Sequence, residues 1–158
     1  MIDLIKGEGV GLDWYAKELE ETRRRLEQGV SLVWGNHYLP HDAAVRELGT
    51  GRSRIETLEG LGIRATICPQ LPVEDGIQAV RGMLKNCWFD RTRCAKGIEA
   101  LRMYRRDYDE RRQEYRVKPL HDWTSHYADA FRYFAVGQRP PAPVYAMRYQ
   151  RPDSRWVV

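Results

Sequence analysis

The fold class is decided by Gly62-Ile63-Arg64-Ala65-Thr66-Ile67-Cys68-Pro69 and by the segment that follows it from Val73. The first is a short apolar run bounded by Gly62 and Pro69, which is typical of a strand. The second predicts a helix whose apolar residues lie on one side. These residues are Ile77, Val80, Met83 and Leu84. A strand followed directly by a helix is the repeating unit of an α/β domain.

The same alternation continues upstream. The sequence predicts a strand at 2–5 and an amphipathic helix from Leu12 to about Gln28, which Gly29 ends. A second strand falls within 30–39, either at Ser31–Trp34 or at His37–Leu39, and Pro40 closes it.

Downstream, Ser53 and Glu56 predict a capping box for a short helix that ends near Gly60. A long helix is expected over 94–115, with Tyr108 facing inward and arginines on its other face. A last helix is capped by Asp122 or Thr124, continues to Val136 and stops at Gly137. Three strands and four or five helices give an α/β class with a thin sheet.

Positive charge is concentrated in the second half of the chain. The 158 residues are enough for one domain and carry a formal net charge of +4, with a pI near 9.0. Residues 1–30 hold five basic and seven acidic side chains, whereas 90–118 hold ten basic and six acidic. Residues 139–158 add four basic and one acidic. This pattern permits nucleic-acid binding, and a solvated helix face explains it equally well.

Several classes of function lack support in the sequence. Cys68, Cys87 and Cys94 form no CxxC pair, which argues against structural zinc and favours free thiols in a reducing compartment. The phosphate-binding pattern GxxxxGK[ST] is absent, and no serine or cysteine has an evident neighbouring base. Neither a signal peptide nor a run of about 20 apolar residues is present, so a soluble, intracellular protein is expected.

The predicted last helix carries the most chemistry. His126 and Asp129 are three residues apart and project from one face, which Asp122 and Tyr133 extend. A carboxylate beside apolar helix positions is costly unless it binds a cation or a hydrogen-bonding partner. The alternative is that Asp122 only caps the helix and that Asp129 pairs with an arginine, such as Arg132 or Arg102.

Asp42 is the second candidate carboxylate, because Pro40-His41-Asp42 lies at the exit of a predicted strand. Two converging carboxylates would hold Mg²⁺ or Mn²⁺, which prefer oxygen ligands and activate water. His126 would then assist as a proton carrier or outer ligand. A helix cap is the alternative role for Asp42. The loop from Gly49 to Ser53 is either a phosphate contact or a plain turn.

Six blocks in order resemble one known family. They are Leu39-Pro40-His41-Asp42-Ala43, Glu47-Leu48-Gly49-Thr50-Gly51-Arg52-Ser53-Arg54, Val73-Glu74-Asp75-Gly76-Ile77, Cys87-Trp88-Phe89-Asp90, Tyr104-Arg105-Arg106-Asp107-Tyr108-Asp109 and His121 to Tyr133. Together they resemble the C-terminal nuclease domain of the large terminase subunit of tailed bacteriophages and prophages. The resemblance covers nearly the whole chain up to about Gly137.

The resemblance implies an RNase H-like three-layer fold with a mixed central sheet flanked by helices. It also implies an endonuclease that cuts concatemeric double-stranded DNA, with two divalent metals, Mg²⁺ or Mn²⁺, held by three acidic residues. Two of these match Asp42 and Asp129, the latter with His126 three positions earlier. Four arginines are the predicted DNA contacts: Arg52, Arg54, Arg105 and Arg106. The implied partners are the terminase small subunit, the portal and the ATPase domain, in the cytoplasm of a bacterial host.

The chain also departs from the family. The family's first metal-binding aspartate lies on its first strand, whereas 2–5 resembles the third strand, so Asp3 is a poor substitute. We therefore expect a partial, N-terminally truncated domain over 1–137, weak or no activity of the isolated chain, and a Pro/Arg-rich tail over 138–158. Two alternatives remain: a non-catalytic DNA-binding or motor-assembly module that uses 91–118, and a resolvase-like nuclease of the same fold.

Overall fold

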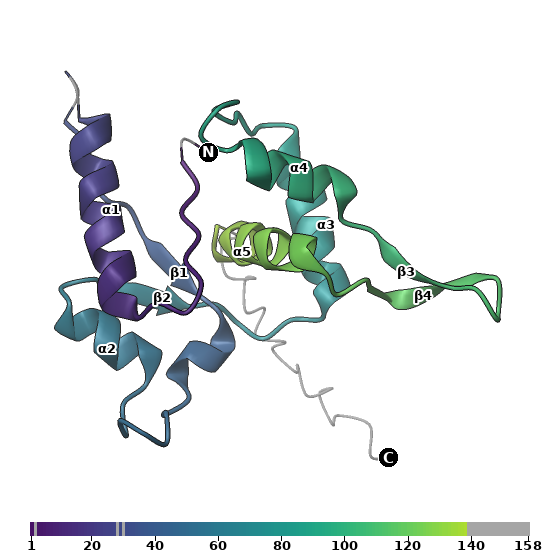
Figure 1. Cartoon of the computed structure of the whole chain (residues 1–158), viewed down its shortest axis with the longest axis horizontal. Helices are drawn as coiled ribbons and strands as arrows, with labels where there is room; N and C mark the ends of the chain where they lie inside the picture. Colours follow the sequence, from purple (N-terminus) through teal and green to yellow (C-terminus); the bar gives the residue numbers. More distant parts are fainter. Residues whose placement is uncertain (2, 28, 30, 139–158) are drawn as a thin grey trace, which may run out of the picture.

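The computed structural model describes residues 1, 3–27, 29 and 31–138 (Figure 1). The predicted tail, apart from Gln138, lies outside the described residues. In chain order the elements are α1 (Leu12–Leu26), β1 (His37–Leu39), η1 (His41–Ala44), α2 (Arg54–Gly60), β2 (Ala65–Ile67), α3 (Val73–Leu84), α4 (Ala95–Met103), β3 (Arg106–Asp109), β4 (Glu114–Pro119) and α5 (Trp123–Gly137). The predicted α/β class is confirmed in the described part of the chain.

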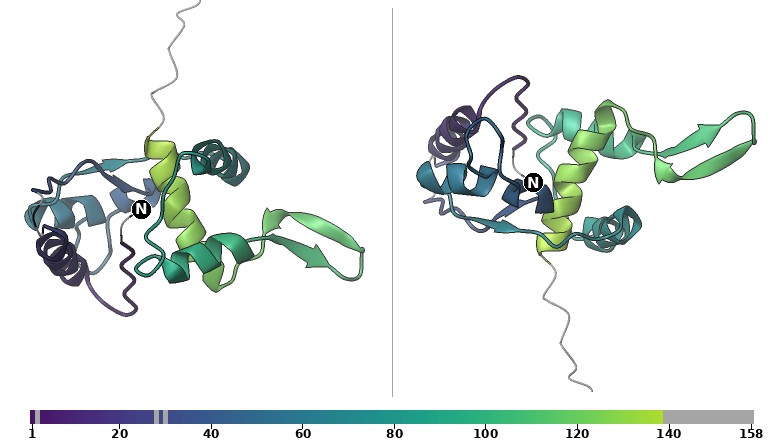
Figure 2. Two further views of the ribbon diagram at one scale, coloured as in Figure 1. Left: turned by 90° about the horizontal axis from the view of Figure 1, so that it is seen from above. Right: turned by 90° about the horizontal axis from the view of Figure 1, so that it is seen from below.

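Helix α5 lies at the centre, with α3 and α4 packed against it (Figures 1 and 2). Its buried side includes Ala128, Phe131 and Ala135. The buried residues of the other two helices are small, namely Gly76 and Ala79 of α3 and Gly97 and Ala100 of α4; of these, Gly97 faces Leu4 of the N-terminal segment. Small residues allow helices to approach closely.

Strands β1 and β2 form a parallel pair, with His37 opposite Ala65 and Leu39 opposite Ile67. Helix α2 packs beside β2, and α5 packs against β1. The Tyr38 ring of β1 meets the Phe134 ring of α5 at a centroid distance of 6.4 Å. This contact fixes the sheet against the central helix and brings the end of β1 close to α5.

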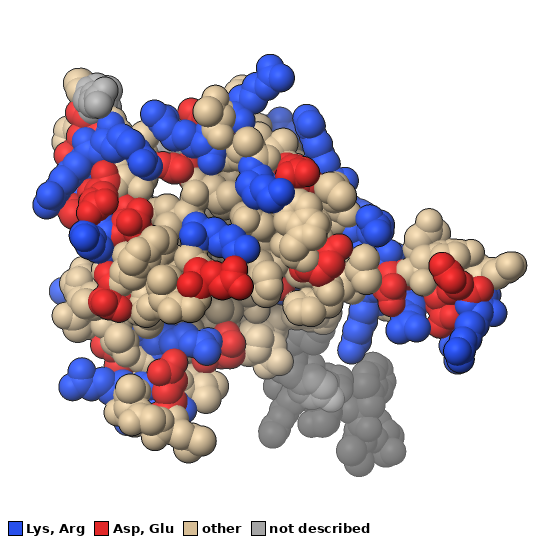
Figure 3. Space-filling view, viewed as in Figure 1, with Lys and Arg blue, Asp and Glu red and all other residues tan. Residues whose placement is uncertain are grey.

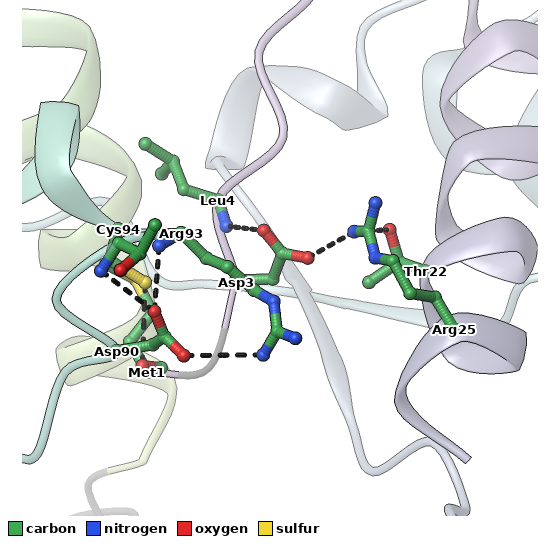
Figure 4. A network of polar contacts seen from close by, with 9 residues as sticks. Met1, Asp3, Leu4, Thr22, Arg25, Asp90, Arg93 and Cys94 are labelled. Carbon is green, nitrogen blue, oxygen red and sulfur yellow. Dashed lines mark hydrogen bonds and ion pairs between the residues drawn. The ribbon is translucent and has the colours of Figure 1, made fainter. Parts of the chain in front are cut away.

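The predicted strand at 2–5 is wrong for the described residues of that segment, which form no strand. The Leu4 amide donates to the carboxylate of Asp3 at 2.8 Å, and this local bond takes a donor that a sheet would need. The other Asp3 oxygen accepts from Arg25 of α1 (Figure 4). At the same end of the chain, the Asp90 amide donates to the Met1 carbonyl. The segment therefore ties α1 to the loop that precedes α4.

An apolar hollow of about 660 Å³ lies between this N-terminal segment, α1, α4 and α5. Leu4, Leu19, Leu101 and Phe131 contribute to its lining, as does Cys87. The other two cysteines are buried, and burial raises the pKa of the thiols of Cys68 and Cys94. All three thiols are free.

The single helix predicted over 94–115 is wrong. Helix α4 ends at Met103, and the chain continues as the antiparallel hairpin β3–β4. The Asp109 carboxylate accepts from the amides of Arg111 and Arg112, which forms a local turn. This side chain-to-backbone bonding competes with a helix, and Gln113 then takes a positive φ of 53°. Tyr108, expected to face inward, is 48% exposed on the hairpin.

The remaining boundaries follow the sequence closely. Helix α1 ends two residues before the predicted Gln28, and Gly29 has a φ of +86°. The predicted capping box of Ser53 and Glu56 is confirmed at the start of α2. The second strand forms at His37–Leu39, the second of the two predicted positions. Among the described residues, no helix is long and apolar enough to cross a membrane.

Replacement of Gly137 tests the packing of α5 on β1. A Cβ at Gly137 would lie 2.3 Å from Cδ1 of Tyr38, so Gly137→Ala should destabilise the protein by about 1–3 kcal/mol. Gly82→Ala in α3 is the matched control, because a Cβ there meets nothing within 4 Å. The control should stabilise the helix by about 0.5–1 kcal/mol. Urea unfolding measures both; equal effects of the two substitutions would contradict the proposed contact.

Candidate functional site

Asp42 lies on η1, immediately after β1. Its neighbour Ala43 is buried and anchors the turn, while the Asp42 side chain is 56% exposed. Arg54 of α2 donates to Asp42 Oδ2 at 3.3 Å and also lies 3.5 Å from Glu47. An exposed pair of this kind is weak, so the carboxylate remains accessible from solvent.

Asp122 is the N-cap of α5, as one of the predicted alternatives held. Its carboxylate accepts from the Thr124 amide at 2.8 Å, and the Asp122 amide donates to Ser125 Oγ at 3.0 Å. The hydrogen bonds from the Thr124 hydroxyl and amide hold the pKa of Asp122 below its ordinary value. The carboxylate is therefore committed to starting the helix.

Asp129 lies two turns further along α5 and is 41% exposed at its side chain. Arg132 donates to the same oxygen, Oδ1, through Nε at 3.2 Å and Nη2 at 2.9 Å. The Arg132 side chain is only 12% exposed and lies over Gly76 of α3, where a Cβ would be 2.5 Å from its Cγ and Cδ. Among the described residues, no donor reaches the second oxygen of Asp129, which is free to accept.

Tyr104, at the C-terminal end of α4, lies close enough to Asp129 for the charge of that carboxylate to affect its pKa. Burial raises the pKa of Tyr104, and the negative charge of Asp129 raises it further. Asp129 therefore lies between the exposed face of α5 and a half-buried polar region. Tyr104 at the end of α4 and Arg132, which lies over α3, form that region.

His126 is exposed on α5, and its ring lies 5.8 Å from the ring of His121. In the part of the chain that the structure describes, no hydrogen bond joins His126 to Asp129. The spacing predicts that His126 and Asp129 share one side of the helix. His126 is therefore a solvent-accessible imidazole one turn before the Asp129 carboxylate.

A chain of contacts connects the segments that carry Asp129 and Asp42. The guanidinium carbon of Arg132 lies 4.8 Å from the centre of the Tyr133 ring. The Tyr133 hydroxyl in turn lies 3.4 Å from Nδ1 of His41, the residue before Asp42. No hydrogen bond joins the two carboxylates among the described residues. The sequence placed Tyr133 on the polar stripe, but its partner His41 is 92 residues away and could not be found from spacing.

The donor types suit a hard cation, but their number is small. Within the described residues, no three His, Cys, Asp or Glu side chains gather closely enough to hold a metal ion. Asp42 and Asp129 supply carboxylate oxygens, and each faces an arginine that competes with a cation. A metal bound here would need further oxygen ligands from water or from a phosphate.

The four arginines predicted to contact DNA differ in their surroundings. Arg54 pairs with Asp42, and Arg106 lies 3.6 Å from Glu74. Arg52 and Arg105 make no ion pair among the described residues, and both are exposed. Positive and negative side chains lie side by side on the projecting hairpin (Figure 3). Comparison with models of protein families, with curated proteins and with solved structures finds no match to this chain.

The cap of α5 should make stability depend on pH. Because the pKa of Asp122 is lowered in the folded protein, its ionised form stabilises the fold above the unfolded pKa near 3.8. That contribution disappears as pH falls through the lower, folded pKa. Asn is also a good cap but has no charge. In urea unfolding, the parent should therefore have a larger free energy of unfolding than Asp122→Asn at neutral pH. This difference should become smaller as the pH is lowered.

Other carboxylates with lowered pKa, such as Asp90 and Asp109, are present in both proteins and cancel in this comparison. A stability difference that stays constant across the acidic range would rule out the Asp122 charge as its source.

Proposed function

We propose that this chain is a metal-dependent DNA endonuclease, of the kind found in the nuclease domain of terminase large subunits. The observation that carries the proposal is the meeting of η1 with α5 through His41 and Tyr133. These are the two segments on which the sequence predicts the carboxylates Asp42 and Asp129. The resemblance of six ordered blocks supports the same assignment.

The position of the site also supports the proposal. Asp42 follows the carboxyl end of β1 in a parallel pair, and sites of α/β proteins are commonly built at such strand ends. An RNase H-like domain is part of the proposal. The parallel β1–β2 pair and the helices packed beside it are compatible with that fold.

The proposed roles follow from the accessible atoms. Asp42 and the free oxygen of Asp129 hold Mg²⁺ or Mn²⁺, together with water and a DNA phosphate. When bound, the metal lowers the pKa of a water molecule and stabilises charge on the phosphate. His126, exposed beside Asp129, carries a proton to or from the reacting group. Arg52 and Arg105, both exposed and without an ion-pair partner among the described residues, neutralise the DNA backbone.

In a packaging motor, the double-stranded substrate would be a concatemer, and the working partners would be a small subunit, a portal and an ATPase domain. The competing function is a non-catalytic DNA-binding module. The arginines facing both carboxylates favour it, because the Asp42–Arg54 pair is also explained as a surface ion pair and the Asp129–Arg132 pair as a structural one. The two functions differ in whether a divalent metal is required.

Nicking of supercoiled plasmid distinguishes them. We expect nicking by the chain at high protein concentration with Mn²⁺, abolition by EDTA, and loss of at least about tenfold in Asp42→Asn and Asp129→Asn. Glu59→Gln is the matched control, because it removes one exposed carboxylate from α2, and it should cut like the parent. Equal cutting by all three variants would refute the site, and binding of DNA without any metal-dependent cutting would favour the binding module.

Metal binding can be followed without activity. Mn²⁺ should broaden the amide NMR signals of η1 and of the middle of α5, and Asp129→Asn should remove the broadening in α5. Arg132→Gln should tighten Mn²⁺ binding severalfold, because it removes a cation that competes for the Asp129 carboxylate. Weaker binding in Arg132→Gln would show instead that Arg132 positions Asp129 for the metal.

A further inference from the structure

The β3–β4 hairpin projects from the body of the protein (Figures 1 and 2). Each of its strands packs mainly against the other. A lone two-stranded hairpin is only marginally stable in water, so one that extends into solvent needs its own side-chain contacts. These contacts divide the hairpin into two different faces.

One face is charged and partly neutralised from within. Arg116 lies 3.3 Å from Asp107 and 3.2 Å from Asp109. Near the turn, Arg112 lies 3.7 Å from Glu114. Three of the four carboxylates between Arg105 and Lys118 are thus paired with arginine, and only Glu110 has no cationic partner within 4 Å among the described residues. The two arginines reduce the repulsion of an anion by these carboxylates, and the hairpin's other cations have to offset the rest.

The other face is aromatic. Tyr108 and Tyr115 are opposite each other in the register, and their rings meet edge to face at 5.0 Å. They are 48% and 66% exposed, and the nearby Val117 is 85% exposed. Because the two rings are so exposed to solvent, their flat aromatic surface is available for stacking.

Cationic side chains lie toward both ends of the hairpin, on either side of the ring pair along the chain. Arg106 lies at the base of the hairpin, and Arg111 lies exposed in its turn. Lys118 is exposed on β4, and neither Arg111 nor Lys118 has an ion-pair partner among the described residues. Stacking surfaces with free positive charge on either side are the combination that binds single-stranded nucleic acid.

We infer that the hairpin binds an unpaired strand of nucleic acid, with bases stacked on Tyr108 and Tyr115 and phosphates beside Arg111 and Lys118. An intact duplex hides the faces of its bases, so it cannot use the two rings in this way. A protein partner would be expected to cover the apolar side chains, but it gives no role to the flanking unpaired cations. This inference rests on the proposed function only in taking nucleic acid as the ligand, and it needs neither metal nor cleavage.

Fluorescence anisotropy with labelled oligothymidylate, in EDTA, tests the inference. The full chain should bind the oligonucleotide, and substitution of either tyrosine should leave its affinity for a duplex of the same length unchanged. Each of Tyr108→Ala and Tyr115→Ala should weaken binding about tenfold, because stacking on one ring contributes roughly 1–3 kcal/mol. Tyr115→Phe keeps the ring and should bind like the parent, whereas Arg111→Gln should reduce the salt dependence of binding.

An equal loss of duplex and oligonucleotide affinity in the alanine variants would overturn the inference, as would the same oligonucleotide affinity in the parent and both alanine variants. A loss in Tyr115→Phe as large as in Tyr115→Ala would also overturn it, since stacking would then not be the cause. Unchanged far-ultraviolet circular dichroism checks that the hairpin variants remain folded. Asp129→Asn should still bind the oligonucleotide. A failure of the nuclease proposal can therefore be distinguished from a failure of this inference.

Discussion

The close packing of α3 and α4 against α5 is the constraint on which the other features depend. Alanines and glycines make up much of it, together with the larger Phe131 of α5, so a displaced helix would leave cavities behind. The same packing holds Arg132 over Gly76, where it pairs with Asp129. It also presents the end of α5 to Tyr38, which keeps β1 and η1 beside the polar stripe. Core and candidate site are consequently parts of one arrangement.

Local signals in the sequence were sufficient for most helices. The capping pair Ser53–Glu56, the cap Asp122 and the stop at Gly29 act within a few residues, so their effect could be predicted. The hairpin could not, because arginine and tyrosine fit one face of a helix as well as alternating strand positions. What decided it was the bonding of Asp109 to two following amides. Likewise, the segment containing Asp3 has strand-forming residues but bonds locally instead.

The proposed members of the candidate site come from the sequence, and the structure adds their environment. Sequence spacing indicated that His126 and Asp129 share a helix face, and strand exit indicated Asp42. The sequence left open whether an arginine pairs with Asp129, and it suggested a helix cap as the other role of Asp42; the structure shows an arginine facing each carboxylate. A site of this kind is electrostatically balanced before any ligand arrives. Binding of a metal cation and a DNA phosphate together would change the net charge of the proposed site less than binding of either ligand alone. Each ligand should therefore increase the affinity for the other.

The distribution of the thiols has a separate consequence. Burial and a raised pKa make Cys68 and Cys94 slow to react with alkylating reagents, since the thiolate is the reactive form. Cys87 is half-buried in the wall of the apolar hollow, whereas the Cys94 thiol lies 3.5 Å from the Met1 carbonyl, against the N-terminal segment. The alkylation rate of Cys94 would therefore depend on how often that segment moves away from it. Alkylation of Cys94 would report local opening of the N-terminal segment, and alkylation of Cys68, which lies in the core, would report global unfolding.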